Sequence, residues 1–187
     1  MCKTQIRITG AGGQGVILAG EALCESAVNE GLHAIQKGTY TSQVRGGATL
    51  VDILIDKEEI FYPYTIPGEI GFMLSTANVS FNRFKDAIRI GGTIVIDPNL
   101  VFPTTDDRKS WKFIEIPIVE IAKNEIGVLA TQSTLALAIT VEITGCVSSE
   151  SALSVMLSKT PKKYREVNER AFHLGVLYAK KALGKSS

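Results

Sequence analysis

The segment Gly10-Ala-Gly-Gly-Gln-Gly15 constrains this chain more than any other feature, because it joins a predicted strand to a predicted helix. The apolar run that ends at Thr9 predicts a strand over residues 5–9, and apolar residues at helical spacing predict a helix over 16–30. A glycine-rich turn between a strand and a helix aims backbone N–H groups at an anion, usually a phosphate. The segment therefore predicts an α/β fold with an anion-binding turn.

The four glycines of this turn have separable roles. Gly10 suits a tight turn, and Gly12 admits a ligand close to the backbone. Gly13 tolerates a positive φ, and Gly15 lets the helix lie near the strand. The spacing fits G-x-G-x-x-G, but a dinucleotide site also needs an acidic residue about 20 residues further on, where residues 33–37 read His-Ala-Ile-Gln-Lys. NAD binding is therefore disfavoured, while a phosphate-bearing ligand, a subunit contact and a purely structural turn stay open.

Strand and helix patterns alternate along the chain, which is typical of a mostly parallel, Rossmann-like sheet with helices on both faces. No linker, repeat or low-complexity tract divides the sequence, so we expect one domain over residues 1–187. A strand over 49–55, a turn over 56–59 and a returning strand over 60–62 predict an antiparallel hairpin attached to the sheet. Further strands are expected at 33–36, 70–74, 93–96 and 112–116, and further helices at 78–89, 118–125, 131–144, 149–158 and 164–183.

Composition argues against several classes of function. The 20 basic and 19 acidic residues give a net charge of +1, so no strong field favours nucleic acid. No apolar run reaches the ~20 residues of a membrane span, and no signal peptide opens the sequence, so we expect a cytoplasmic protein without membrane contact. Cys2, Cys24 and Cys146 are scattered, and no metal site is expected from them.

A second informative segment is the polar loop over residues 37–47. It carries the hydroxyls of Thr41 and Ser42, and Arg45 stands before two glycines. Ligands of parallel sheets bind at the carboxyl ends of the strands, where we expect this loop and the turn over 10–15 to face one crevice. Arg45 can hold a phosphate or carboxylate through two parallel N–H bonds, and an ordinary surface loop is the alternative.

No catalytic constellation accompanies these two segments. His33 and His173 fall in a predicted strand and a predicted helix, and no G-x-S-x-G elbow is present. Asp97 is the one carboxylate expected at the ligand-binding edge, and its Asp-Pro-Asn setting is ordinary turn chemistry. We therefore expect no catalytic residue in this chain, which suits a binding subunit whose partners carry the reaction.

Two motifs together resemble the gamma subunits of 2-oxoacid:ferredoxin oxidoreductases. They are Gly10-Ala-Gly-Gly-Gln-Gly-Val-Ile-Leu-Ala-Gly20 and Thr39-Tyr-Thr-Ser-Gln-Val-Arg-Gly-Gly47. The similarity continues through residues 91–96, 116–122 and 135–145 into the final helices, so it covers nearly the whole chain. The second motif resembles the 2-oxoglutarate-type subunits more than the pyruvate-type subunits.

The resemblance implies a subunit of an enzyme that oxidatively decarboxylates a 2-oxoacid, joins the acyl group to coenzyme A and reduces ferredoxin. Thiamine diphosphate and the iron–sulfur clusters then belong to partner subunits, alpha and beta with or without a ferredoxin-like delta subunit. The gamma subunit is implied to act in assembly and to share the coenzyme A site. The candidate binding residues are Gly10, Gly12, Gly13, Gln14, Gly15, Thr41, Ser42 and Arg45.

The chain departs from its resemblance at the helix that begins Ala130-Thr-Gln-Ser-Thr134. Many relatives carry an Asn there, for which Thr131 and Gln132 are the candidate substitutes, and a Gly where this chain has Ala136. Two other functions stay open: a free-standing NAD(P)-dependent reductase and a purely structural subunit with an empty glycine turn. The sequence also leaves open which 2-oxoacid is used and whether the isolated chain forms a homodimer.

Overall fold

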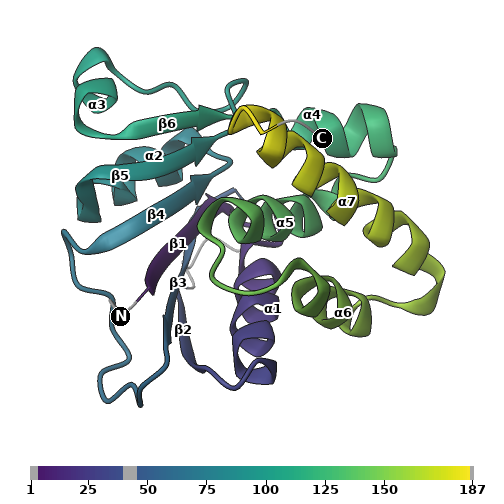
Figure 1. Cartoon of the computed structure of the whole chain (residues 1–187). Coiled ribbons are helices and arrows are strands. Elements are labelled where there is room, and N and C mark those ends of the chain that lie inside the picture. Colours follow the sequence, from purple (N-terminus) through teal and green to yellow (C-terminus); the bar gives the residue numbers. More distant parts are fainter. Residues whose placement is uncertain (1–3, 40–45, 186–187) are drawn as a thin grey trace.

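The computed structural model describes residues 4–39 and 46–185, which are built around one six-stranded sheet (Figure 1). The strands span Thr4–Ala11 (β1), His33–Thr39 (β2), Ala48–Asp56 (β3), Ile70–Ser75 (β4), Ile88–Ile96 (β5) and Lys112–Glu115 (β6). Their order across the sheet is β2-β3-β1-β4-β5-β6. Because β1 lies between β3 and β4, the glycine turn that follows β1 leaves from the middle of the sheet.

The sheet is mostly parallel, as predicted. β1, β4, β5 and β6 pair in parallel, and β3 runs antiparallel to both β1 and β2, so β3 alone points the other way. An antiparallel hairpin is present, but it joins β2 to β3. The predicted return strand at Ile60–Tyr62 is wrong, because the hydrogen-bonding groups of β3 are already taken by β1 on one side and β2 on the other.

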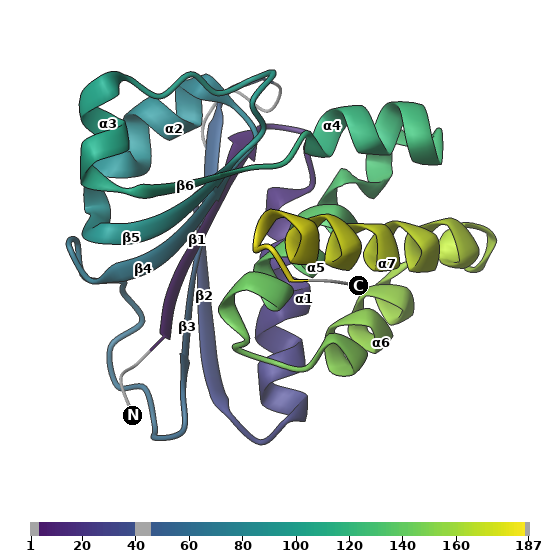
Figure 2. The same cartoon turned by 45° about the horizontal axis from the view of Figure 1, so that its top comes forward.

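Helices cover both faces of the sheet (Figure 2). One face carries α1, α5, α6 and α7 and is named the helix-rich face, and the other carries α2 and α3 and is named the opposite face. A π-helical stretch over Ile121–Ile126 prolongs α4. The α-helices span Val16–Asn29 (α1), Asn78–Phe84 (α2), Thr105–Ser110 (α3), Ile118–Glu120 (α4), Gln132–Thr144 (α5), Ser149–Lys159 (α6) and Arg165–Ala182 (α7).

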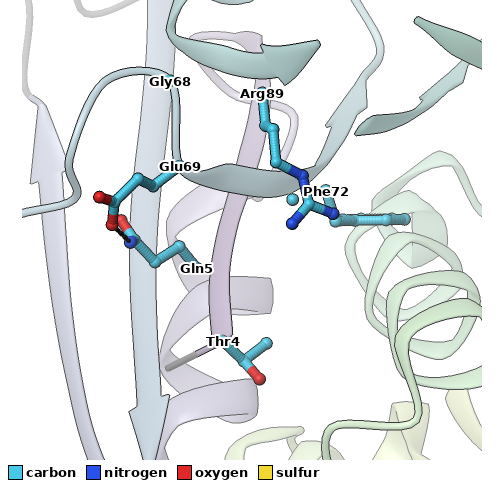
Figure 3. Close-up of a pocket in the computed structure, with 7 residues that line it drawn as sticks. Thr4, Gln5, Gly68, Glu69, Phe72 and Arg89 are labelled. Atoms are coloured by element: carbon cyan, nitrogen blue, oxygen red, sulfur yellow. Dashed lines mark hydrogen bonds between the residues drawn. The ribbon is translucent and has the colours of Figure 1, made fainter. Parts of the chain in front are cut away.

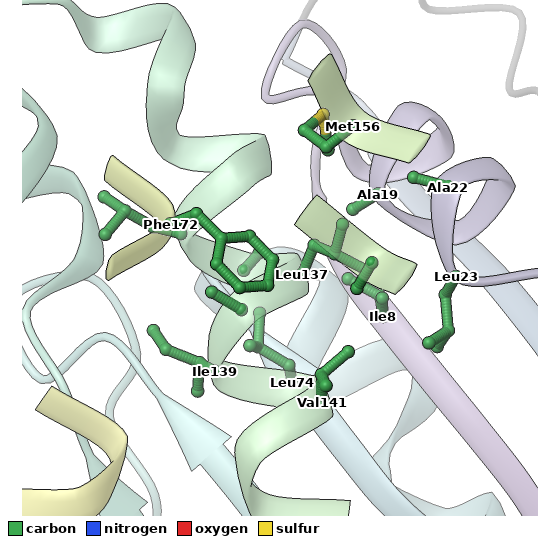
Figure 4. Close-up of a cluster of buried hydrophobic side chains, with 14 of the residues drawn as sticks. Ile8, Ala19, Ala22, Leu23, Leu74, Leu137, Ile139, Val141, Met156 and Phe172 are labelled. Carbon is green, nitrogen blue, oxygen red and sulfur yellow. The ribbon is translucent and has the colours of Figure 1, made fainter. Parts of the chain in front are cut away.

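The main core lies between the sheet and the helix-rich face (Figure 4). The predicted apolar stripe of α1, Val16, Ala19, Leu23 and Ala27, is buried there. Side chains of β1, β3, α5 and α6 pack against α1, β4 and α7 extend the same core, and each large apolar side chain buried in this way contributes about 1.5–3 kcal/mol. This packing fixes the start of α1 against β1 and so positions the glycine turn.

The opposite face is covered in two ways. Over β4 to β6 lies an apolar cluster that includes Phe81 of α2 and Trp111, which follows α3, and this part is named here the helix-covered half. Over β1 to β3 runs the connection from β3 to β4, residues 57–69, which contains no helix or strand and is named the strap. Below the strap, the sheet presents the buried side chains of Arg7 and Asp52.

The predicted helix over 78–89 is too long. α2 ends at Phe84, a 3₁₀ turn follows, and Ile88 already belongs to β5. The strand predicted from Thr93 therefore starts earlier, with an irregularity at Gly91, whose φ is +76°, that interrupts the pairing with β4. α3 was not predicted, although Thr104 and Asp107 form a capping box at its start. The helix predicted over 118–125 is α4 together with the π-helical stretch that follows it, and the other predicted elements are confirmed to within three residues at each end.

Candidate anion-binding site

The glycine turn lies where β1 and β4 end side by side at the carboxyl edge of the sheet. From there α1 turns onto the helix-rich face and α2 onto the opposite face (Figure 2). Open α/β sheets bind their ligands at such a switch point, outside the carboxyl ends of neighbouring strands. The turn thus occupies the position that the fold favours for a ligand.

Gly13 and Gly15 adopt backbone conformations that L side chains rarely take, with φ of +99° and +72°. Gly15 is the N-cap residue of α1. Among the residues that the structure describes, a Cβ on Gly13 would meet no atom within 4 Å, whereas a Cβ on Gly15 would lie 2.7 Å from the Cβ of Ser133. The turn therefore has an open side at Gly13 and a closed side at Gly15, where the start of α5 packs against it.

The side chain of Gln14 holds the turn together from within. Its Oε1 accepts hydrogen bonds from the backbone N–H of Ala11 (2.6 Å) and the hydroxyl of Thr76 (2.8 Å). Its Nε2 donates to the carbonyl of Thr76 at 3.4 Å. Thr76 follows β4 directly, so Gln14 ties the ends of the two strands together. Sequence reasoning missed Thr76, although its place just after a strand at this edge was a usable signal.

The turn and the second predicted segment meet, as expected from the strand directions. The N–H of Gly12 donates to the carbonyl of Gly47 at 2.9 Å, and the N–H of Gly46 donates to the carbonyl of Gly12 at 3.4 Å. Thr41, Ser42 and Arg45 lie outside the described residues. The N–H groups of Ala11 and Gly12 are thus engaged within the protein, and the donors left to consider for an anion are those of Gly13, Gly15 and the first turn of α1.

The start of α5 forms the closed wall of the site. Gln132 and Ser133 are buried there, and they line a void of about 10 Å³ together with Gln14, Gly15 and Thr76. The Oε1 of Gln132 is buried and, among the described residues, has no hydrogen-bond partner. The hydroxyl of Thr131, the other candidate substitute for the relatives' Asn, donates to the carbonyl of Val128 at 2.7 Å.

Asp97 ends β5 at the same edge and is fully buried. Its Oδ1 accepts from the N–H of Asn99 (3.1 Å) and its Oδ2 from the N–H of Val119 (2.9 Å). Burial raises the pKa of the Asp97 carboxyl, although these two hydrogen bonds oppose the shift. Oδ1 thus fastens the turn that follows β5 and Oδ2 joins it to α4, so Asp97 has a structural role here.

A larger cavity, of about 420 Å³, lies at the amino ends of β1 and β4 (Figure 3). Gln5, Glu69 and Arg89 line it, and the Nε2 of Gln5 donates to Glu69 at 3.0 Å. The amino edge is the end of the sheet away from the glycine turn, so this cavity and the turn are separate features.

Metal ligands, thiols and long apolar helices are the other features that bear on function over residues 4–39 and 46–185. Within these ranges, no three His, Cys, Asp or Glu side chains are grouped as metal ligands. Burial raises the pKa of the thiols of Cys24 and Cys146, which disfavours the reactive thiolate. No helix in the same ranges is both long and apolar enough to cross a membrane.

Residues 5–178 match the POR family, pyruvate ferredoxin/flavodoxin oxidoreductase. The KorC subunit of 2-oxoglutarate synthase from Methanocaldococcus jannaschii is 32% identical over 179 residues, covering 95% of each chain. The gamma subunit of a keto/oxoacid ferredoxin oxidoreductase from Geobacter sulfurreducens PCA has the same fold, with a TM-score of 0.84, 28% identity, and coverage of 97% of this chain and 99% of that one. The 2-oxoglutarate:ferredoxin oxidoreductase from Magnetococcus marinus shares the fold, with a TM-score of 0.85, 21% identity, and coverage of 97% of this chain but 32% of that one.

Proposed function

Since the chain belongs to the pyruvate ferredoxin/flavodoxin oxidoreductase family, we propose that it serves as the gamma subunit of a 2-oxoglutarate:ferredoxin oxidoreductase. The similarity to KorC over 95% of both chains and to the Geobacter gamma subunit over nearly its full length supports this role. In the complex, 2-oxoglutarate is oxidatively decarboxylated, its acyl group passes to coenzyme A, and ferredoxin takes the electrons. This chain supplies binding and assembly, and its partners are the alpha and beta subunits with or without a delta subunit.

The part of the site that this chain contributes is a phosphate cradle for coenzyme A. The supporting observation is the open side of the glycine turn at Gly13, next to the first turn of α1 at the switch point of the sheet. There the N–H groups of Gly13, Gly15 and the first helical turn hold a phosphate, and the helix dipole favours its negative charge. Gly10, Gly12 and Gln14 shape the turn, and Thr41, Ser42 and Arg45 add hydroxyls and a positive charge.

The redox and decarboxylation chemistry belongs to the partners in this proposal. The iron–sulfur clusters are held by the alpha, beta or delta subunits, because a cluster requires several thiolate ligands close together. Over residues 4–39 and 46–185, this chain offers no such grouping. Thiamine diphosphate is assigned to these subunits because the family resemblance implies this division. The chain acts as one domain over residues 1–187. Its backbone N–H groups and the dipole of α1 position coenzyme A, and the partner subunits carry out the reaction.

The test is Arg45→Ala in the intact complex, with Arg89→Ala as its control, because Arg89 lies at the amino edge away from the turn. We expect Arg45→Ala to raise the KM for coenzyme A about tenfold, equivalent to about 1.4 kcal/mol, with the decarboxylation half-reaction unchanged. Arg89→Ala should leave both quantities unchanged. Steady-state kinetics with varied coenzyme A and a coupled assay of decarboxylation measure the two effects.

The same preparations separate the alternatives. An unchanged KM for coenzyme A in an intact Arg45→Ala complex would favour a purely structural subunit. Binding of NADH or NADPH by the isolated chain, measured as a change in nicotinamide fluorescence, would favour a free-standing reductase. Turnover of 2-oxoglutarate by the purified chain alone would contradict the proposal outright.

A further inference from the structure

The strap is an ordered segment because polar contacts fasten it to the sheet. The hydroxyl of Thr65 donates to Oδ2 of Asp52 at 2.6 Å, and the N–H of Ile66 donates to Oε1 of Gln5 at 2.8 Å. The Nζ of Lys37 lies 4.1 Å from the centre of the Tyr64 ring. Asp52 is itself held by Arg7, with Nε–Oδ1 and Nη2–Oδ2 distances of 2.7 and 2.8 Å.

The strap turns its large apolar side chains toward solvent. Phe61 is 77% exposed, Tyr62 76%, Tyr64 58% and Ile66 51%. The part of the sheet below the strap presents the Arg7–Asp52 pair and the amide of Gln5. These polar groups offer no apolar surface against which aromatic rings could pack. Contiguous exposed apolar groups on an ordered segment are typical of a protein-binding surface. A long connection without regular structure is likewise usually functional.

We propose that the strap is the surface through which this chain docks on a companion subunit of the oxidoreductase. The proposal rests on the function proposed above and adds where the contact is made. Exposed Glu58 and Glu59 flank the apolar side chains at one end and Glu69 at the other, against Lys57 and Lys37. Complementary charges steer and align an interface, so we expect basic side chains on the partner surface that faces these acidic groups. The exposed apolar side chains of the strap would then fit an apolar recess between those basic side chains.

The arrangement of charges favours a companion subunit over a second copy of this chain. Acidic side chains lie at both ends of the strap, so a two-fold axis through its middle would bring Glu58 and Glu59 of each copy near Glu69 of the other. This like-charge repulsion disfavours self-association through the strap.

The test compares two surface variants of the tagged full-length chain, each co-expressed with its own alpha and beta subunits. The strap variant carries Phe61→Ser and Tyr62→Ser, and the control carries Phe102→Ser, a Phe that is 64% exposed after β5. We expect the strap variant to retain at least tenfold less alpha and beta subunit, identified by mass spectrometry, than the wild type and the control. Thermal unfolding of each isolated chain should be unchanged.

Several outcomes would overturn the docking proposal. Retention of alpha and beta subunits by the strap variant at the wild-type level would overturn it alone and leave the proposed function intact. Absence of these subunits from the wild-type preparation would overturn the proposed function and the docking proposal together. If the isolated wild-type chain dimerises, the strap variant is monomeric and the complex still forms, the occupant is a second copy and the proposal is wrong. A charge-reversed strap, Glu58→Lys with Glu59→Lys, should weaken retention more at low salt than at high salt.

Discussion

On the opposite face of the sheet, α2 and the residues on either side of α3 cover β4 to β6 with buried apolar side chains, whereas the strap covers β1 to β3 through hydrogen bonds and an ion pair. In the helix-covered half, Phe81 and Trp111 close a cluster with strand residues such as Met73. In the strap-covered half, the aromatic side chains remain outside. Burial of apolar surface stabilises the first half directly, while desolvation offsets much of the gain from a buried ion pair. The ion pair instead sets where the strap lies and which way its side chains point.

The sharpest test of the helix-covered half is Phe81→Ala. Phe81 is fully buried and packs edge-to-face on Phe113 with ring centres 6.0 Å apart. Removing the ring should lower the free energy of unfolding by about 4 kcal/mol, because the rigid cluster leaves a cavity. Urea unfolding followed by circular dichroism measures this loss. A loss below about 1 kcal/mol would mean that the cluster collapses around the gap and is not the main source of stability in this half.

Asp52→Ala is the corresponding test of the strap-covered half. It leaves the guanidinium of Arg7 buried without its partner and removes the acceptor of Thr65, so we expect a loss of about 3 kcal/mol. The double variant Arg7→Met with Asp52→Leu should recover most of that stability, because apolar residues of similar volume replace a buried pair well. In both variants, the N–H of Ile66 should exchange faster with solvent. Unchanged exchange would show that Gln5 alone secures the strap.

A smaller effect is expected from Asp107→Asn at the start of α3. The Oδ1 of Asp107 accepts from Lys85 at 2.6 Å and its Oδ2 from the N–H of Thr104 at 2.8 Å. Burial acts to raise the pKa of Asp107, but these partners outweigh it and lower the pKa. The carboxylate therefore stabilises the protein fully above its unfolded pKa of about 3.9, and that contribution is lost as the pH falls through the lower folded pKa.

At neutral pH, Asp107→Asn should lower the free energy of unfolding by about 1–2 kcal/mol, and the difference from the wild type should close on acidification. Asp106→Asn is the matched control, because the Asp106 side chain is 89% exposed and pairs with Lys109 on the surface. It should change stability by less than about 0.5 kcal/mol. Equal effects of the two substitutions at neutral pH would argue against a special role for the buried carboxylate.

The smallest stability effect is expected for the strap substitutions Phe61→Ser with Tyr62→Ser. Both side chains point to solvent, so the free energy of unfolding of the isolated chain should change by less than about 0.5 kcal/mol. Compared with the effect of Phe81→Ala, this result would distinguish aromatic residues that stabilise the fold from aromatic residues that bind a partner. A loss above about 2 kcal/mol would show that the rings pack inward in solution.

Much of the fold was predictable because its signals are local. The glycine turn, the apolar stripe of α1 and the serine-capped start of α6 are each readable in a short window of sequence. The neighbours of β3 in the sheet were not predictable in this way. Ile60–Tyr62 has the composition of a strand, but in the structure β1 and β2 pair with the two edges of β3. The end of α2 was missed for a similar reason, because Ile88 suits either a helix face or a buried strand.

Some contacts of the candidate site were likewise predictable from the sequence, and others were not. The meeting of the turn with Gly46 and Gly47 followed from strand directions and is confirmed. Thr76 and Ser133 lie just after β4 and at the start of α5, and only the three-dimensional arrangement brings them against the turn. The part played by Thr41, Ser42 and Arg45 stays a prediction.

The place of β1 in the sheet has a consequence for how the protein is made. β1 emerges from the ribosome first, yet its two neighbours are β3 and β4, which end at residues 56 and 75. During synthesis, the strand that carries the glycine turn has no partner on one edge until β3 has emerged and none on the other edge until β4 has emerged, which requires the residues up to 75. Pairing across such a sequence separation is slow and leaves a strand edge exposed to aggregation. The nascent chain is therefore most vulnerable before β4 has emerged, and a chaperone that shields β1 over that interval would raise the yield of folded protein.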